Sequence, residues 1–205
     1  MISENLHIVS DFKDYYDICS SDDGILYKRN MSDCMQRGRA LKYLRNIGIK
    51  TIDVKQVSNF SYLDKKLVVY TDPKKHNGQG KKICTYDEAI SCYGNFLASP
   101  YIEEAEGITI KYLQIGKQRF TLTFRNYNDN LNIGQLVSIS KQENSYNRLI
   151  GLPIFSIDYI SNGVEMVATD FNEVQNLQRI GMNNYLGAKD IVSEILESLV
   201  VYNKL

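Results

Sequence analysis

The chain has 205 residues, of which 43% are hydrophobic and 23% charged, and its 24 basic residues balance 24 acidic ones. This is the composition of an ordinary globular protein with the size of one domain. No apolar run reaches the length of a membrane-spanning helix, and the first residues lack the basic and apolar blocks of a secretory signal. We therefore expect a soluble intracellular protein without contact with a membrane.

The first predicted elements are a short strand at residues 6–9 and a helix from Asp11 to about Cys19. The apolar members of the helix fall at i, i+3, i+4 and i+7, which is the stripe of an amphipathic helix. These residues are Phe12, Tyr15, Tyr16 and Cys19. Asp11 suits the N-cap, and Asp14 suits the first turn, where a carboxylate meets the positive end of the helix dipole.

The aspartates of this segment have a competing interpretation. A strand that ends in one aspartate, with a second nearby, is typical of Mg²⁺ sites in enzymes that cleave phosphate esters. That alternative assigns the metal to Asp11 and Asp14, with Asp53 or Asp72 as a further ligand. On a helix Asp11 and Asp17 point in different directions, so the three N-terminal aspartates do not converge.

The next predicted elements are a strand at residues 24–30 and a helix from Ser32 to about Asn46 that ends at Gly48. Strands follow at residues 49–57 and 65–71. The loop from Asp72 to Lys82 contains breakers, and Thr85 with Glu88 predicts a capping box at the start of the following helix.

The second half of the chain predicts an antiparallel hairpin at residues 108–126 and strands at 135–140, 153–159 and 164–169. Asp170 and Glu173 are expected to cap a helical turn, and a last helix runs from about Lys189 to Tyr202. Because no linker or repeat interrupts the pattern, we expect a single domain over residues 1–205. The predicted fold is α+β, a largely antiparallel sheet with an N-terminal helix pair and a C-terminal helix.

The cysteines and histidines carry no metal signature. No two of the four cysteines have CxxC spacing, and His7 and His76 stand at no recognised ligand distance from a cysteine or from each other. We expect reduced thiols and neither a metal nor a cofactor. A nucleophilic pair of a cysteine and a histidine brought together by folding stays open as an alternative.

The zero net charge conceals an uneven distribution. Residues 1–27 contain one basic and six acidic residues, residues 28–82 contain fourteen and four, and residues 83–205 contain nine and fourteen. If the basic segment is contiguous on the surface, it attracts anions. The alternative is that its cations pair with the acidic ends of the same chain.

Two parts of the basic segment are candidate binding sites. In the loop, backbone N–H groups and lysines before a helix start are suited to a phosphate, although GQGKKICT does not match the P-loop spacing. The helix predicted from Ser32 to about Asn46 carries arginines suited to a nucleic-acid backbone. The alternatives are a solvated hairpin loop and the wet face of an amphipathic helix. The candidate ligand-binding residues are Lys74, Lys75, Gly78, Gly80, Lys81, Lys82, Thr85, Arg37, Arg39 and Arg45.

The motif SDFKDYYD, residues 10–17, resembles the opening of a family of uncharacterised proteins encoded mainly by tailed bacteriophages. The resemblance covers residues 6–17, and RFTLTFRNYNDNLNIG at 119–134 is similar in kind. It implies a phage or prophage origin and a location in the host cytoplasm, and it brings no catalytic residues.

These observations predict a phage-type accessory protein that binds an anionic phosphate-bearing ligand through its basic central segment. The ligand is a nucleotide, including a host signalling nucleotide, or a nucleic acid. The alternatives are a structural or protein-interaction component, with a homo-oligomer as one form, and a metal-dependent phosphoesterase that uses the N-terminal aspartates.

Overall fold

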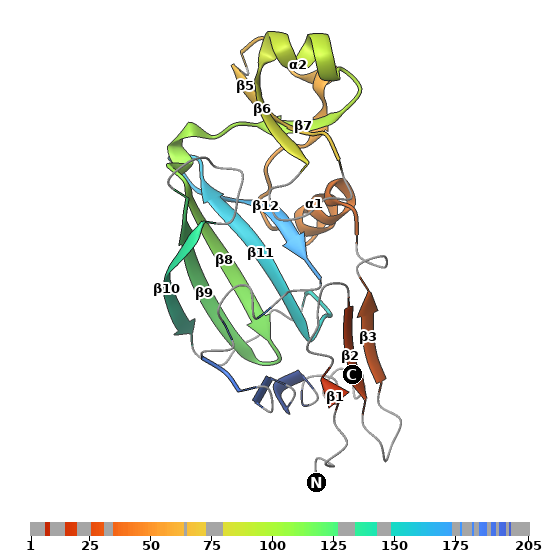
Figure 1. Cartoon of the computed structure of the whole chain (residues 1–205), viewed down its shortest axis with the longest axis vertical. Helices are drawn as coiled ribbons and strands as arrows, with labels where there is room; N and C mark the ends of the chain where they lie inside the picture. The colour runs from red at the N-terminus through yellow and green to blue at the C-terminus, as the bar shows by residue number, and fades with distance from the viewer. Residues whose placement is uncertain are drawn as a thin grey trace.

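The computed structural model contains three antiparallel sheets in its described part: a four-stranded sheet at one end of an elongated molecule, a five-stranded sheet below it and a three-stranded sheet beside the lower part of the latter (Figure 1). It describes residues 7–8, 15–19, 26–30, 35–63, 65–72, 80–126, 134–142, 149–173, 177, 182, 185–187, 190–191, 193–195 and 197. Helices and antiparallel sheets together confirm the predicted α+β class. No helix in the described part of the chain has the length and apolar character needed to span a bilayer.

The N-terminal segment forms a sheet and not the predicted helix. Its strands are β1 (His7–Ile8), β2 (Tyr15–Cys19) and β3 (Leu26–Asn30), in the order β1-β2-β3. The helix expected up to Cys19 is therefore wrong, and α1 alone remains of the N-terminal helix pair. The sequence YYDIC is rich in residues that favour strands. A segment this short does not distinguish the apolar pattern of a helix from that of a strand, and pairing with β1 on one side and β3 on the other makes it a strand. Asp11 and Asp14 lie outside the described residues.

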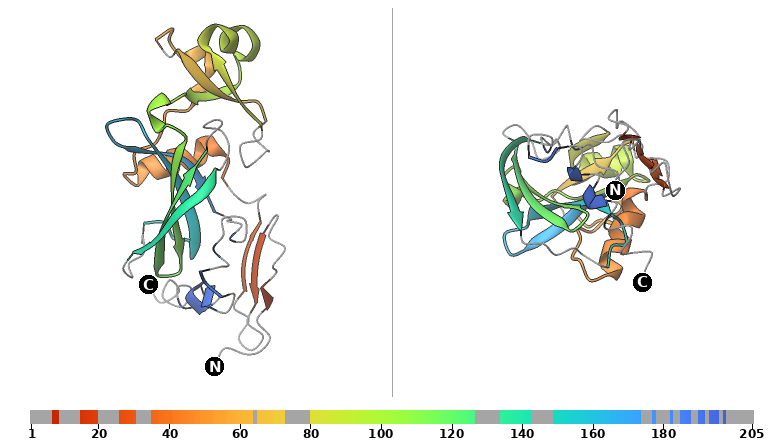
Figure 2. Two further views of the ribbon diagram at one scale, coloured as in Figure 1. Left: turned by 60° about the vertical axis from the view of Figure 1, so that its left-hand side comes forward. Right: turned by 90° about the horizontal axis from the view of Figure 1, so that it is seen from below.

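A five-stranded sheet, called here the large sheet, has the order β10-β9-β8-β11-β12 and follows a curve when viewed end-on (Figure 2). Its strands are β8 (Ile108–Ile115), β9 (Gln118–Arg125), β10 (Gln135–Gln142), β11 (Ile154–Ser161) and β12 (Met166–Asn172). The predicted hairpin is confirmed, and Gly116 at its turn has a φ of 56°. The predicted cap at Asp170 is wrong, because that residue is paired within β12.

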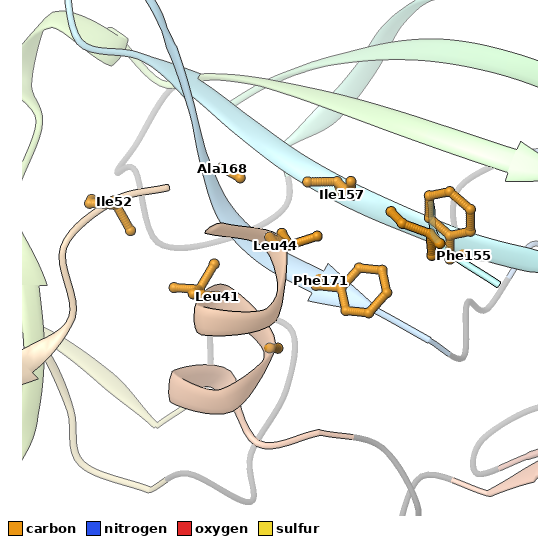
Figure 3. Packing of buried hydrophobic residues seen from close by; sticks show 9 residues of the cluster. Leu41, Leu44, Ile52, Phe155, Ile157, Ala168 and Phe171 are labelled. Carbon is orange, nitrogen blue, oxygen red and sulfur yellow. The ribbon is translucent and has the colours of Figure 1, made fainter. Parts of the chain in front are cut away.

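Helix α1 (Arg37–Asn46) covers one face of β11 and β12 (Figure 3). Leu41 and Leu44 are buried in one cluster with Phe155, Ile157 and Phe171. The helix begins five residues later than predicted, and Gly48 follows its end with a φ of 86°, as expected for a residue without a Cβ.

A four-stranded sheet, called here the small sheet, has the order β4-β7-β5-β6 and carries helix α2 (Tyr86–Tyr93) on one face. Its strands are β4 (Lys55–Gln56), β5 (Lys66–Tyr70), β6 (Lys81–Thr85) and β7 (Leu97–Pro100). Short 3-10 helices occupy Val57–Asn59 and Glu103–Ala105. The strand predicted at 49–57 is confirmed only at β4, while β6 occupies residues expected to belong partly to a loop.

The described residues of the C-terminal helix, 190–191, 193–195 and 197, are helical, as predicted. Ile195 is buried, and the backbone of Glu194 approaches the β8–β9 turn so closely that a Cβ at Gly116 would collide with its carbonyl group. Gly116 therefore serves both the turn and the docking of this helix.

Candidate functional site

A row of charged side chains crosses three neighbouring strands of the large sheet. Lys111 of β8 stands opposite Asp158 of β11, which stands opposite Asp170 of β12. Directly opposed residues share a face, so this row lies on the face that α1 does not cover. Lys111 donates a hydrogen bond to Asp158, and its ammonium lies 3.4 Å from the hydroxyl of Ser156. The Lys111 side chain is only 2% exposed, so the pair is an internal one.

The start of α1 adds a guanidinium to this row. Arg37 Nη2 lies 3.0 Å from Asp170 Oδ2, Nη1 donates to the carbonyl of Thr169 at 2.6 Å, and the guanidinium lies 4.8 Å from the ring centre of Tyr70. A cation in a first helical turn is opposed by the helix dipole, so these contacts hold Arg37 in place. Burial lowers the pKa of Arg37, but Asp170, Tyr70 and Asp158 outweigh burial and leave its pKa raised.

The small sheet closes the site with Tyr70 and Lys81, which are directly opposed on β5 and β6. They occupy the face opposite α2, and Tyr70 shares a hydrogen bond of 2.9 Å with Ser99. Lys81 is half-buried. Burial lowers the pKa of its ammonium, and Arg37 lowers it further, while Asp170 and Asp158 act in the opposite direction. Among the residues that the structure describes, Lys81 has neither an ion pair nor a hydrogen bond to its side chain.

The site thus combines three cations with two carboxylates. Lys111 and Arg37 each have a carboxylate partner, and Lys81 supplies a positive charge that these two acids do not neutralise. A half-buried ammonium whose nearby carboxylates are already paired with other cations is unfavourable, so the arrangement favours an incoming anion.

The structure brings together two of the ten predicted binding residues, Arg37 and Lys81. Gly80 forms the turn before β6, where its carbonyl accepts the N–H groups of Thr71 and Asp72. The predicted residues Lys74, Lys75 and Gly78 lie outside the described part of the chain.

The other predicted residues have different surroundings. Successive strand residues point to opposite faces, so Lys82 turns away from Lys81 and lies 2.6 Å from Glu88 of α2. Thr85 accepts the N–H of Glu88 at 3.3 Å and caps α2, which confirms its predicted local role. Arg39 is exposed, and Arg45 donates to the hydroxyl of Thr51.

Part of the basic segment is neutralised by carboxylates of the same chain. Besides Arg37, four lysines, of which Lys55 is half-buried and the others are exposed, pair with carboxylates in Lys50–Glu165, Lys55–Asp53, Lys66–Glu103 and Lys82–Glu88. These pairs agree with the alternative interpretation, in which the cations of the basic segment pair with acidic residues of the same chain. They contribute little to stability but reduce the positive field of this surface.

The sequence analysis did not identify four residues of the site: Lys111, Asp158, Asp170 and Tyr70. For Lys111 and its partner Asp158 the sequence does contain a signal. Lys111 is in phase with Leu113 and Ile115, which are buried, and a charge at such a position predicts a partner on a neighbouring strand.

Carboxylates of the described residues do not gather into a metal centre. No group of three histidine, cysteine, aspartate or glutamate side chains within that part of the chain is arranged to hold a metal ion. Glu173, which follows β12, accepts the backbone N–H of Met35. Asp53, a ligand in the alternative with N-terminal aspartates, lies 3.4 Å from Lys55.

No family model matches the chain, and no curated protein matches it. Among solved structures it resembles D-alanine–D-alanine ligase from Bacillus anthracis complexed with ATP, with 18% identity over 85% of this chain and 70% of that one, and a TM-score of 0.50. It also resembles the ATP-grasp ligase PsnB complexed with a phosphomimetic variant of its minimal precursor, Mg and ADP. That match has 9% identity, a TM-score of 0.51, and covers 83% of this chain but 59% of PsnB. The chain thus shares the fold of a large part of these two ligases.

Proposed function

We propose that this chain binds a nucleotide and that Arg37 and Lys81 receive its phosphate groups, beside the internal pair of Lys111 and Asp158. The observation that carries the proposal is Lys81, a half-buried ammonium beside Arg37 that has no ion pair of its own among the described residues, because Asp158 and Asp170 are paired with Lys111 and Arg37. A phosphate placed there would supply the missing negative charge and accept charge-assisted hydrogen bonds. The two solved structures of the same fold contain ATP and ADP, which supports a nucleotide as the phosphate-bearing ligand.

The small sheet also offers an apolar surface next to these cations. Val68 and Ile83 are directly opposed on β5 and β6, half-buried, and in phase with Tyr70 and Lys81. A flat aromatic base can pack on aliphatic side chains while the phosphates extend towards the cations. A nucleotide therefore suits this face better than inorganic phosphate does.

A small nucleotide is favoured over a nucleic acid. A polymer requires a long uncompensated positive surface, and four lysines of the basic segment are paired with carboxylates. Affinity for a mononucleotide should change only mildly between 50 and 300 mM salt, whereas a nucleic acid would lose affinity steeply. The N-terminal motif supports the further proposal of a phage-encoded accessory protein that acts in the host cytoplasm.

Isothermal titration calorimetry with ATP, ADP and GTP tests the proposal. We expect Lys81→Met to weaken binding of the best nucleotide by about tenfold or more, the size of a lost charge-assisted hydrogen bond. Lys82→Met is the matched control, because it removes the same charge from the opposite face of the same strand. No heat of binding with any of the three, or equal losses in both variants, would contradict the proposal.

A further inference from the structure

The carboxylates that would hold a divalent cation in this site are already occupied by cations of the chain. Asp158 and Asp170 are directly opposed on neighbouring strands. Their carboxylate oxygens are the donors that Mg²⁺ would use. Asp158 accepts from Lys111, and Asp170 from Arg37. As arranged, the residues present do not fit a bound metal ion.

Lys111 has little freedom to leave Asp158. Its side chain is 2% exposed and lies in the middle of the sheet, opposite Leu122 on one side and Asp158 on the other. A metal ion that took over Asp158 would leave a buried ammonium without its partner, which is strongly unfavourable.

Arg37 is held just as firmly. It donates to Asp170 and to the carbonyl of Thr169, and its guanidinium covers the ring of Tyr70. Release of Asp170 to a metal ion would break the ion pair and place a guanidinium close to a divalent cation.

The charge balance acts in the same direction. Three cations already face two carboxylates, so a divalent cation would increase the excess of positive charge, whereas the phosphate chain of a nucleotide would reduce it.

We propose that Lys111 and Arg37 take the place of a divalent cation beside Asp158 and Asp170, so that this chain binds the metal-free form of its nucleotide, with Arg37 and Lys81 facing the phosphates. This inference rests on the proposed function. It separates this chain from the PsnB structure, whose ADP is accompanied by Mg.

Calorimetry of the full chain with ATP in EDTA and in excess MgCl₂ tests the inference. We expect binding in EDTA to be as tight as in MgCl₂ or tighter, since the metal complex of ATP carries less negative charge. Binding that needs MgCl₂, or is at least tenfold tighter with it, would overturn the metal-free mode and leave the proposed function intact. Absence of binding in both buffers would overturn the proposed function as well.

A second readout uses the metal alone. In electron paramagnetic resonance titrations, Mn²⁺ should remain free in the presence of the unaltered chain. Lys111→Met removes the competing ammonium and should create a Mn²⁺ site that Lys111→Met with Asp158→Asn lacks. A Mn²⁺ site of similar affinity in the unaltered chain would show that the carboxylates are accessible to metal, which contradicts the inference even if the Lys111 variants fail to fold.

Discussion

Both sheets have one face covered by a helix and one face turned towards the charged site, and the two kinds of face differ in chemistry. In the large sheet, Phe155 and Ile157 lie under α1, while Asp158 lies on the other face. In the small sheet, Cys84 belongs to the apolar cluster with α2, whereas Lys81 lies near Arg37. Because side chains alternate along a strand, neighbouring residues serve stability and binding separately.

This difference implies that changes under the helices act through lost packing, whereas changes on the open faces act through charge: on stability where they break an internal pair, and on binding where they remove Lys81. A buried apolar side chain contributes through packing and removal from water, which require no ligand. The charged row contributes mainly through its pairing. The following variants test that separation, from the largest expected effect to the smallest.

Phe155→Ala should give the largest loss of stability. Its ring is fully buried beneath α1, with centroids 5.9 Å from Tyr112 and 6.0 Å from Phe171. Removal of a buried aromatic ring typically costs about 3–5 kcal/mol, measured here as the free energy of unfolding in urea. Tyr62→Ala is the control, since Tyr62 is 74% exposed and surface changes cost about 0.5 kcal/mol or less. Equal losses in both variants would contradict the burial of the α1 face.

Asp158→Asn should cost about 3 kcal/mol, because it leaves the buried ammonium of Lys111 without a charge partner. The same urea titration should show that Lys111→Met with Asp158→Asn recovers most of this stability, since no uncompensated charge remains. If the double variant is as unstable as the sum of the single ones, the two residues do not act as a pair.

The sequence predicted those features that depend on neighbouring residues. The β8–β9 hairpin, the Thr85 cap and the end of α1 at Gly48 each follow from residues a few positions apart. The segment Tyr15–Cys19 was mistaken for a helix because its pattern is too short to separate two periods, and its pairing with Leu26–Asn30 decided the outcome.

The site depends on register between distant segments, which the sequence does not reveal. Arg37 and Asp170 are 133 positions apart, and Lys111 and Asp158 are 47 apart. Only the fold places β8, β11 and β12 side by side. Two successive lysines are also indistinguishable by amino-acid type alone. Because residues 81 and 82 belong to a strand, Lys81 points to one face of the small sheet and Lys82 to the other.

Nucleotide affinity should fall as pH rises through the pKa of Lys81, which burial and Arg37 hold below the ordinary value of 10.5. Loss of the proton removes the charge that attracts phosphate, so we expect a decrease of about tenfold. Without nucleotide, the lowered pKa of Lys81 makes the free energy of unfolding increase with pH. The unfolded chain binds more protons between the lowered pKa and 10.5, so stability should rise with pH over that window.

Calorimetry with ATP across alkaline pH, together with urea titrations without nucleotide, measures both slopes. Lys81→Arg is the control, because a guanidinium keeps its charge throughout this range. A decrease in affinity that persists unchanged in Lys81→Arg would assign the titration to another group.

Thr85→Ala should have the smallest effect and should change stability alone. The hydroxyl of Thr85 accepts the N–H of Glu88 at the start of α2, and loss of such a cap costs about 1 kcal/mol. Thr85→Ser keeps a capping oxygen and should retain most of that stability. Because this hydroxyl is already committed to the helix, ATP affinity should remain within error in both variants. A loss of affinity in Thr85→Ala without a loss of stability would instead make Thr85 a ligand donor, as the sequence predicted, and would extend the binding surface along β6 to the start of α2.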